Sequence, residues 1–266
     1  RKLVNKADFI FHLAGVNRTH DFKEFDKINY SLTQYICDII SNKKTRTDVF
    51  FSSSTQSGNS TEYGRSKSKA EDILLEIGKN TKNSIYISKL PNVFGKWSKP
   101  NYNSVVATFC YNIARELNVD IHDGSKEIKL LYIDDLIDTI IKLVNKKNQF
   151  TGFIDIKPTK NISLRKLYNL IKKFSLVQKK NFIPNIGSKF NKNIYSTFLS
   201  FLPKEKFSYN LNQNIDKRGR FVEFLKTQSS GQISFFTAKK DVIRGGHYHH
   251  TKTEKFLVLQ GTALFR

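Results

Sequence analysis

The chain has 266 residues, which is enough for one large domain or two smaller ones with a buried core. Its 45 Lys and Arg against 23 Asp and Glu give a formal net charge of +22. The excess is mostly lysine spread along the chain, and most aromatic residues fall at positions with core periodicity. We therefore expect no nucleic-acid partner. No apolar run approaches the ~20 residues that a membrane span needs, which excludes that class.

Cysteine and methionine usage is informative. Cys37 and Cys110 each lie in an apolar helical pattern, so we expect neither a disulfide framework nor a cysteine metal site, and a reducing cytoplasm fits. The chain contains no methionine, not even at position 1. Its first residues run almost at once into a buried strand and its last residues stop inside an expected hairpin. We therefore expect a fragment that is truncated at both ends.

Residues 8–15 form an apolar run that is typical of a strand buried on both faces of a parallel sheet. The run ends in Leu13, Ala14 and Gly15, and small residues there let a flat ligand approach the backbone. A plain strand-to-loop turn has the same composition. An apolar series with helical spacing follows at Ile28, Leu32, Tyr35, Ile36, Ile39 and Ile40.

The next strand, residues 48–52, leads into a cluster of serines, and ten residues later comes the spacing Tyr63-x-x-x-Lys67. Apolar periodicity predicts a helix over residues 62–78, where positions four apart share a face. A phenol titrates near ~10, but a neighbouring ammonium favours the phenolate and lowers this pKa. The pair can therefore act as a general acid, with Ser54, or Ser53 as second choice, bonding a reacting carbonyl.

A Tyr-x-x-x-Lys pair is common on helices, and most such pairs have no catalytic role. Here the preceding strand ends in Ser-Ser-Ser, and a further strand follows at residues 85–90. This alternation of strands and helices predicts a doubly wound, Rossmann-like parallel sheet, in which ligands bind at the carboxyl ends of the strands. The serines and the tyrosine lie at that edge, so we favour the catalytic interpretation.

The following elements are expected to form a smaller substrate domain. The turn at residues 90–95 carries Asn92, whose amide can reach a substrate phosphate or sugar. Helical patterns follow at residues 105–117, 136–144 and 164–174. Asp134 and Ser163 stand where N-caps of the last two helices are expected, and residues 122–125 indicate a turn between short strands.

From about residue 209 the pattern changes to short alternating stretches at 220–225 and 232–237, which predict antiparallel strands. In a strand that follows, His247 and His249 share a face, and Glu254 returns on the neighbouring strand. Two imidazoles and a carboxylate suit a divalent ion such as Zn²⁺. A His-rich surface turn is the alternative.

The segments SSST and YGRSK resemble the Ser/Tyr/Lys triad of the extended short-chain dehydrogenase/reductases, the NAD-dependent epimerase/dehydratase family. The resemblance implies catalysis by Ser54, Tyr63 and Lys67. It also implies that Leu13, Ala14 and Gly15 line the ribose of NADPH or NADH together with Tyr63 and Lys67. Asn29 resembles a structural asparagine of that family, and Asn92 matches a residue that often contacts substrate.

The spacing of His247, His249, Glu254 and Gly261 resembles the first motif of the cupins, small β-barrels that usually take a fourth ligand from a second motif. That motif is absent, and whether a metal there would be catalytic or structural is open. We expect a reductase domain over residues 1–207 and a partial cupin over residues 208–266.

This pairing resembles bifunctional enzymes of capsular polysaccharide synthesis. In these, the cupin epimerises C3 of a UDP-linked 2-acetamido-2,6-dideoxy-hexos-4-ulose and the reductase then reduces its 4-keto group, on the way to UDP-N-acetyl-L-fucosamine. The resemblance implies a UDP-sugar substrate, Zn²⁺ and a homodimer. The glycine-rich turn that seats the pyrophosphate is missing, so we expect this chain to bind the cofactor weakly or not at all. The rivals are another nucleotide-sugar epimerase or dehydratase, and a non-catalytic metal-binding module for sugar recognition or dimerisation.

Overall fold

The computed structural model describes residues 1–227 and 231–265. The chain divides into two compact units, residues 1–177 with 184–208, and residues 178–183 with 209–266. Among the described residues no helix combines the length and the apolar character needed to cross a membrane.

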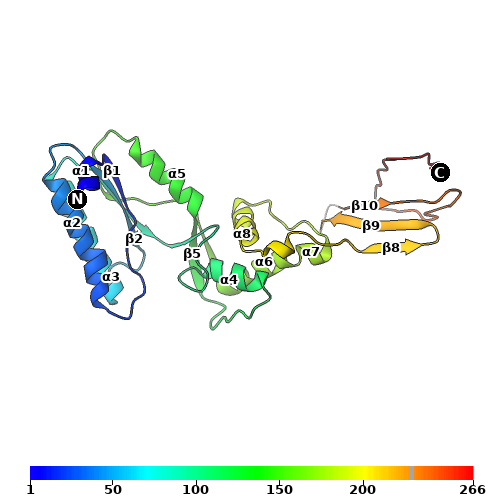
Figure 1. Cartoon of the computed structure of the whole chain (residues 1–266), viewed down its shortest axis with the longest axis horizontal. Helices are drawn as coiled ribbons and strands as arrows, with labels where there is room; N and C mark the ends of the chain where they lie inside the picture. Colours follow the sequence, from blue (N-terminus) through cyan, green and yellow to red (C-terminus); the bar gives the residue numbers. More distant parts are fainter. Residues whose placement is uncertain (228–230, 266) are drawn as a thin grey trace. The chain divides into compact units, whose positions relative to one another are not determined.

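The first unit alternates strands and helices (Figure 1). In chain order its elements are α1 (Lys2–Lys6), β1 (Phe9–His12), the π-helix η1 (Phe25–Ser31), α2 (Leu32–Ser41), β2 (Asp48–Ser54), α3 (Glu62–Asn80), β3 (Ile85–Leu90), β4 (Asn92–Phe94), α4 (Val105–Ala114), β5 (Glu127–Tyr132), α5 (Ile133–Val144), β6 (Thr151–Phe153), β7 (Thr159–Ser163), α6 (Leu164–Ser175), α8 (Lys189–Leu199) and the 3₁₀-helix η2 (Lys204–Lys206). The short α7 (Val177–Lys180) spans the sequence boundary between the units.

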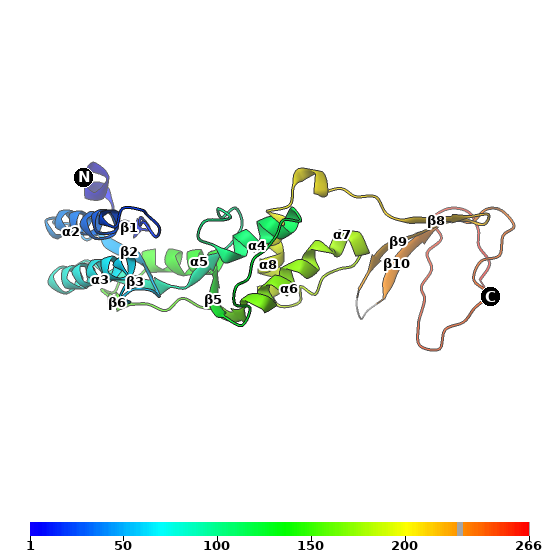
Figure 2. The same cartoon turned by 90° about the horizontal axis from the view of Figure 1, so that it is seen from below.

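The main sheet has the order β1-β2-β3-β6, and all of its strands are parallel (Figure 2). Side chains alternate between its faces, so Val49 and Phe51 pack with α2 and α3 while Phe50 and Tyr86 pack with α5. Helices therefore cover both faces, with α2 and α3 on one side and α5 on the other (Figure 1). The predicted Rossmann-like parallel sheet is confirmed.

A second sheet, β4-β5-β7, packs with α4, α6 and α8 around a separate apolar core. The predicted cap of α6 is confirmed, because Ser163 Oγ accepts a hydrogen bond from Lys166 N (3.3 Å). The predicted cap of α5 is wrong. The N-cap is Tyr132, two residues earlier, and the helix begins directly after β5, so Asp134 lies inside the first turn, where its charge faces the positive helix end.

Residues 122–125 form a turn, but the strand expected before it is absent: the described residues 117–121 pair with no strand. Ser125 donates from both its backbone N–H and its hydroxyl to Asp123 Oδ1. The Asp123 side chain thus stabilises the turn. Of the two strands expected to flank it, the one that follows is present, as β5.

The second unit contains the antiparallel sheet β10-β9-β8, made of β8 (Gln213–Asp216), β9 (Gly219–Lys226) and β10 (Gln232–Phe236). The predicted antiparallel strands are confirmed. Two expectations about this part of the chain are wrong: the described residues 237–265 form neither the strands expected to carry His247, His249 and Glu254 nor the hairpin expected at residues 256–265. Its apolar side chains, such as Leu257 at 81% exposure, have no face to pack against, and an unpacked hairpin is only marginally stable.

His12 ends β1 in a buried position, with Nε2 2.8 Å from Thr33 Oγ1. Burial lowers the pKa of His12 from 6.5 to about 4, and the Lys67 charge acts in the same direction. Between these two values the unfolded chain binds the proton and the folded chain does not, so acid favours unfolding.

We predict that the free energy of unfolding contributed by His12 falls by about 2 kcal/mol between pH 7 and pH 5. Urea unfolding of the parent and of His12→Gln at both pH values measures this difference. The exposed His20→Gln is the matched control and should follow the parent. A His12→Gln variant with the same pH dependence as the parent would contradict the prediction.

Candidate active site

Helix α3 is seated tightly against the loop that follows β2. Thr61 caps the helix, its Oγ1 accepting from Gly64 N at 3.0 Å. A Cβ on Gly64 would lie 1.9 Å from Asn59 Oδ1 and 2.6 Å from the Gln56 carbonyl oxygen. Only glycine allows this approach of α3 to the loop, and Lys67 on the same helix reaches the Ser52 carbonyl oxygen near the carboxyl end of β2.

Lys67 is buried between α3 and β2, at 4% exposure. Its Nζ donates to the Ser52 carbonyl oxygen (3.0 Å) and lies 4.7 Å from the centre of the Phe51 ring. Burial lowers the pKa of Lys67 to about 8, and the Glu71 carboxylate opposes this shift. The ammonium is therefore the main form below that pH.

Tyr63 is half-buried one helical turn before Lys67. Its ring lies edge-on to Phe25, with centroids 6.0 Å apart, and its carbonyl oxygen accepts from Ser66 Oγ (2.9 Å). The ring is thus fixed by packing between α3 and η1. Its role as the proton donor stays a prediction.

The loop after β1 reaches Lys67. A Cβ on Gly15 would lie 3.1 Å from Lys67 Nζ and 3.1 Å from Asn29 Oδ1, so the backbone at Gly15 passes directly beside the ammonium. Leu13 and Ala14, which precede it, are exposed. The structure therefore brings the predicted cofactor loop and the predicted catalytic lysine together, with a cradle that a side chain at position 15 would fill.

Asn29 holds this loop in place from η1. Its Nδ2 donates to the Val16 carbonyl oxygen (2.9 Å) and to Ser66 Oγ (3.0 Å), and its Oδ1 accepts from Val16 N (2.8 Å). The side chain is fully buried. The predicted structural role of this residue matches these contacts, since one amide joins the loop after β1 to α3.

The serines that end β2 differ in their partners. Ser53 is buried and donates its hydroxyl to Glu71 Oε1, whereas Ser54 is half-buried and its Oγ accepts from Gln56 N (3.1 Å). The proton of Ser54 stays available to another acceptor. The geometry therefore favours Ser54 over Ser53 as the residue that bonds a carbonyl.

Asn92 begins β4 and is exposed. Its Nδ2 donates to the Lys129 carbonyl oxygen on β5 (3.3 Å). Leu90 at the end of β3 pairs with Ser54 at the end of β2. Asn92 comes two residues after Leu90, so it follows the carboxyl edge of the main sheet that carries Ser54. A substrate role for Asn92 stays a prediction.

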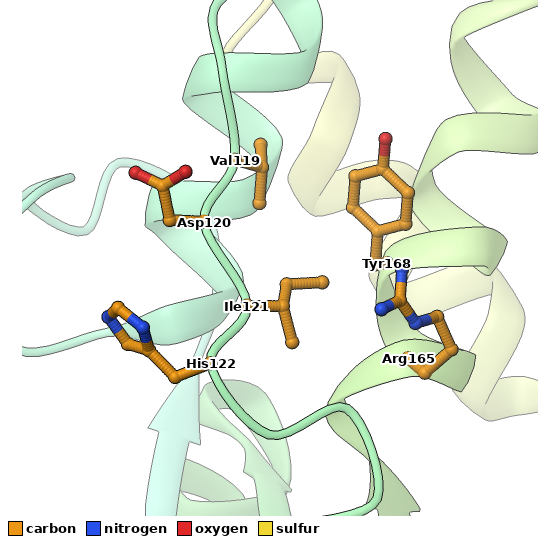
Figure 3. Close-up of a pocket in the computed structure, with 6 residues that line it drawn as sticks. All are labelled: Val119, Asp120, Ile121, His122, Arg165 and Tyr168. Atoms are coloured by element: carbon orange, nitrogen blue, oxygen red, sulfur yellow. The ribbon is translucent and has the colours of Figure 1, made fainter.

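A cavity of about 340 Å³ opens beside the segment that precedes β5 (Figure 3). Ile121 and Arg165 point toward each other across it, while His122 points away. Arg165 lies in the first turn of α6 and donates its backbone N–H to the Gly124 carbonyl oxygen (3.0 Å). Tyr168, one turn on, packs edge-on against Phe109 and lines the same cavity.

The predicted metal ligands lie in the second unit on exposed, irregular backbone. The rings of His247 and His249 are 4.8 Å apart, and His249 Nε2 lies 3.6 Å from Glu254 Oε1. The same carboxylate oxygen pairs with Lys252 Nζ at 2.7 Å. Within the described ranges no group of three His, Cys, Asp or Glu side chains forms a metal centre, so zinc stays a prediction.

Sequence reasoning did not assign a site role to Glu71, which lies within the helix predicted over residues 62–78. The residue stands four positions after Lys67 and eight after Tyr63, on the same face of α3. That spacing is the signal that could have found it. What the spacing does not show is burial, which decides whether a carboxylate acts on its neighbours.

Comparison with known proteins identifies the family. Residues 1–154 match the NAD dependent epimerase/dehydratase family, and residues 214–266 match the polysaccharide biosynthesis C-terminal domain. The chain belongs to the NAD dependent epimerase/dehydratase family. The cupin assignment of the second unit stays a prediction.

Two relatives place the chain more closely, and a third protein shares its fold. A UDP-2-acetamido-2,6-beta-L-arabino-hexul-4-ose reductase of Pseudomonas aeruginosa is 45% identical over 265 residues, which are 100% of this chain and 71% of the relative. The capsular polysaccharide assembling protein CapF of Staphylococcus aureus is 36% identical, with a TM-score of 0.73, over 88% of this chain and 63% of CapF. A UDP-glucuronic acid 4-epimerase of Bacillus cereus, at 18% identity, TM-score 0.62 and 78% coverage of both chains, shares the fold.

We predict that Gly64→Ala destabilises the fold by about 1–2 kcal/mol, because overpacking against Asn59 and Gln56 outweighs the better helix propensity of alanine. Lys79→Ala, an exposed site on the same helix, is the control and should change stability little. Urea unfolding monitored by circular dichroism measures both. Equal stability of Gly64→Ala and the parent would contradict the prediction and show that the loop after β2 can move away from the added methyl group at little cost.

Proposed function

We propose that the protein reduces the 4-keto group of a UDP-linked 2-acetamido-2,6-dideoxy-hexos-4-ulose with NADPH, in the synthesis of a polysaccharide precursor of the UDP-N-acetyl-L-fucosamine type. One observation carries the proposal: the Gly15 backbone, Lys67 and the Tyr63 helix meet at the carboxyl edge of a parallel sheet. The name of the 45% identical relative supports the choice of substrate.

The cradle at Gly15 fits a nicotinamide cofactor. The backbone from Leu13 to Gly15 is open, and Lys67 presents an ammonium that can bond ribose hydroxyls. When bound, NADPH supplies the hydride. Ser54 donates a hydrogen bond to the substrate carbonyl, and Tyr63 transfers its phenolic proton to the oxygen of the forming alcohol. Lys67 stabilises the phenolate that remains, because a nearby positive charge favours the ionised form.

The cavity beside α6 suits the nucleotide end of this substrate. Arg165 carries a permanent positive charge that can pair with phosphate oxygens, and the ring of Tyr168 offers an aromatic face for a uracil. Asn92 follows the edge that carries Ser54, where a sugar would extend toward the reacting carbonyl. The substrate is thus assigned to groups on both sheets of the first unit.

We predict that Tyr63→Phe in the full-length protein lowers the rate of keto-sugar reduction by ~10²- to 10⁴-fold, because only the proton donor is removed. The loss of NADPH absorbance measures the rate. Tyr35→Phe on α2, an exposed tyrosine, is the control and should leave the rate unchanged. A Tyr63→Phe rate within threefold of the parent would remove this residue from the mechanism.

We also propose that the second unit epimerises C3 of the same keto sugar and binds Zn²⁺. The donor types fit, since His247, His249 and Glu254 lie close together. In the described arrangement Glu254 pairs with Lys252, so this carboxylate would have to leave the lysine before it could ligate a metal. A homodimer and a cytoplasmic location remain parts of the same proposal.

Metal analysis tests the zinc site. We predict about one zinc per protomer in the parent, none in His249→Ala, and an unchanged content in His250→Ala, whose ring instead contacts Tyr248. Imidazole must be deprotonated to ligate, so zinc should also leave as the solution is made acidic. A metal-free parent, purified without chelators, would refute the site.

A further inference from the structure

Glu71 is a buried carboxylate on the helix that carries Tyr63 and Lys67. It is 3% exposed, and a carboxylate is almost never buried to that degree unless it is paired. It stands one turn beyond Lys67 on the same face of α3. The reduction proposed above gives it no task.

Two side chains from the sheet reach the two oxygens of Glu71. Ser53 on β2 donates its hydroxyl to Oε1, and Lys89 Nζ on β3 lies 3.3 Å from Oε2. Lys89 is 43% exposed and lies 4.9 Å from the centre of the Phe153 ring on β6. One carboxylate thus joins α3 to two neighbouring strands just below the end of β2.

The buried ammonium of Lys67 has few charged neighbours. Among the described residues, the titratable groups whose charges act on it are His12 on β1, a positive group if protonated, and Glu71 on its own helix, while Tyr63 stands one turn before it. From the described part of β2 it is met by the Ser52 carbonyl oxygen and the Phe51 ring. Lys89 on β3 acts through Glu71, whose charge it partly offsets.

We propose that Glu71 is a positioning residue of this active site: its carboxylate keeps Lys67 in the ammonium form and holds Ser53 away from the substrate, so that Ser54 alone meets the carbonyl. The effect on catalysis rests on the proposed reductase function, whereas the effect of the Glu71 charge on Lys67 does not. A buried cation without a counter-charge releases its proton more readily. Loss of the Glu71 charge would therefore weaken both the hold on ribose and the support of the Tyr63 phenolate.

The decisive measurement is the titration of Lys67 itself, because it needs neither cofactor nor substrate. The ¹³Cε and ¹⁵Nζ resonances of Lys67 are followed against pH and assigned by their loss in Lys67→Arg. Glu71→Gln keeps the shape and can still accept the Ser53 hydrogen bond, so only the charge is removed. Glu76→Gln, an exposed glutamate on the same helix, is the matched control.

We expect the midpoint of Lys67 in Glu71→Gln to fall by about one pH unit, which is a tenfold loss of proton affinity, while Glu76→Gln follows the parent. In the reduction assay the alkaline limb of kcat/KM should move by the same amount. An unmoved midpoint in folded Glu71→Gln overturns the inference. If the parent titrates as expected and its variant shifts, but no keto sugar is reduced, the proposed function fails and the electrostatic role stands.

A second pair of variants applies if Glu71→Gln does not fold. Lys89→Met frees the Glu71 carboxylate from its outer partner, so the midpoint of Lys67 should rise. Lys69→Met removes a lysine of similar exposure from α3 and controls for the general loss of positive charge. A Lys89→Met midpoint that rises no further than that of Lys69→Met overturns the inference.

Discussion

The burial of one ammonium between α3 and β2 governs the geometry of the first unit. A charge removed from water must be compensated, and Lys67 is compensated by the Ser52 carbonyl oxygen, the Phe51 ring and the field of Glu71. These partners require α3 to lie close against the end of β2. The Gly64 contact with the preceding loop permits that approach. Tyr63 is placed by the same packing, one turn away.

Hydrogen bonds between uncharged groups hold the parts of the candidate site that lie away from the Lys67 charge. Asn29 connects Val16 and Ser66, which are far apart in sequence, through a single buried amide. His12 and Thr33 make a similar connection between β1 and α2. Buried polar groups that are fully paired define one arrangement, because each alternative leaves a donor or acceptor unsatisfied. The loop at Gly15 is therefore held beside Lys67 without an ion pair of its own.

The second unit shows how far a pattern depends on its surroundings. Alternation in β9 and β10 produced strands, since each pairs with a neighbour in an antiparallel sheet. Residues 245–261 have a comparable pattern but form no strand in the described chain, and Leu257 and Leu259 stay exposed. Strand formation needs a packed face as well as a suitable sequence. The imidazoles of His247 and His249 accordingly approach each other on irregular backbone.

Local patterns in the sequence determined the parallel sheet, the helix that bears Tyr63 and Lys67, and the cap at Ser163, because each rests on periodicity or on contacts within a few residues. The N-terminus of α5 was misjudged at Asp134, since β5 runs directly into that helix and leaves no loop for a cap. Only the tertiary structure decided that Lys67 and Glu71 are buried together, that Ser53 is bound to Glu71 while Ser54 stays available, and that Gly15 lies beside the ammonium. These relations depend on the closeness of segments far apart in the chain, and burial, which sets their electrostatic strength, is a property of the packed fold alone.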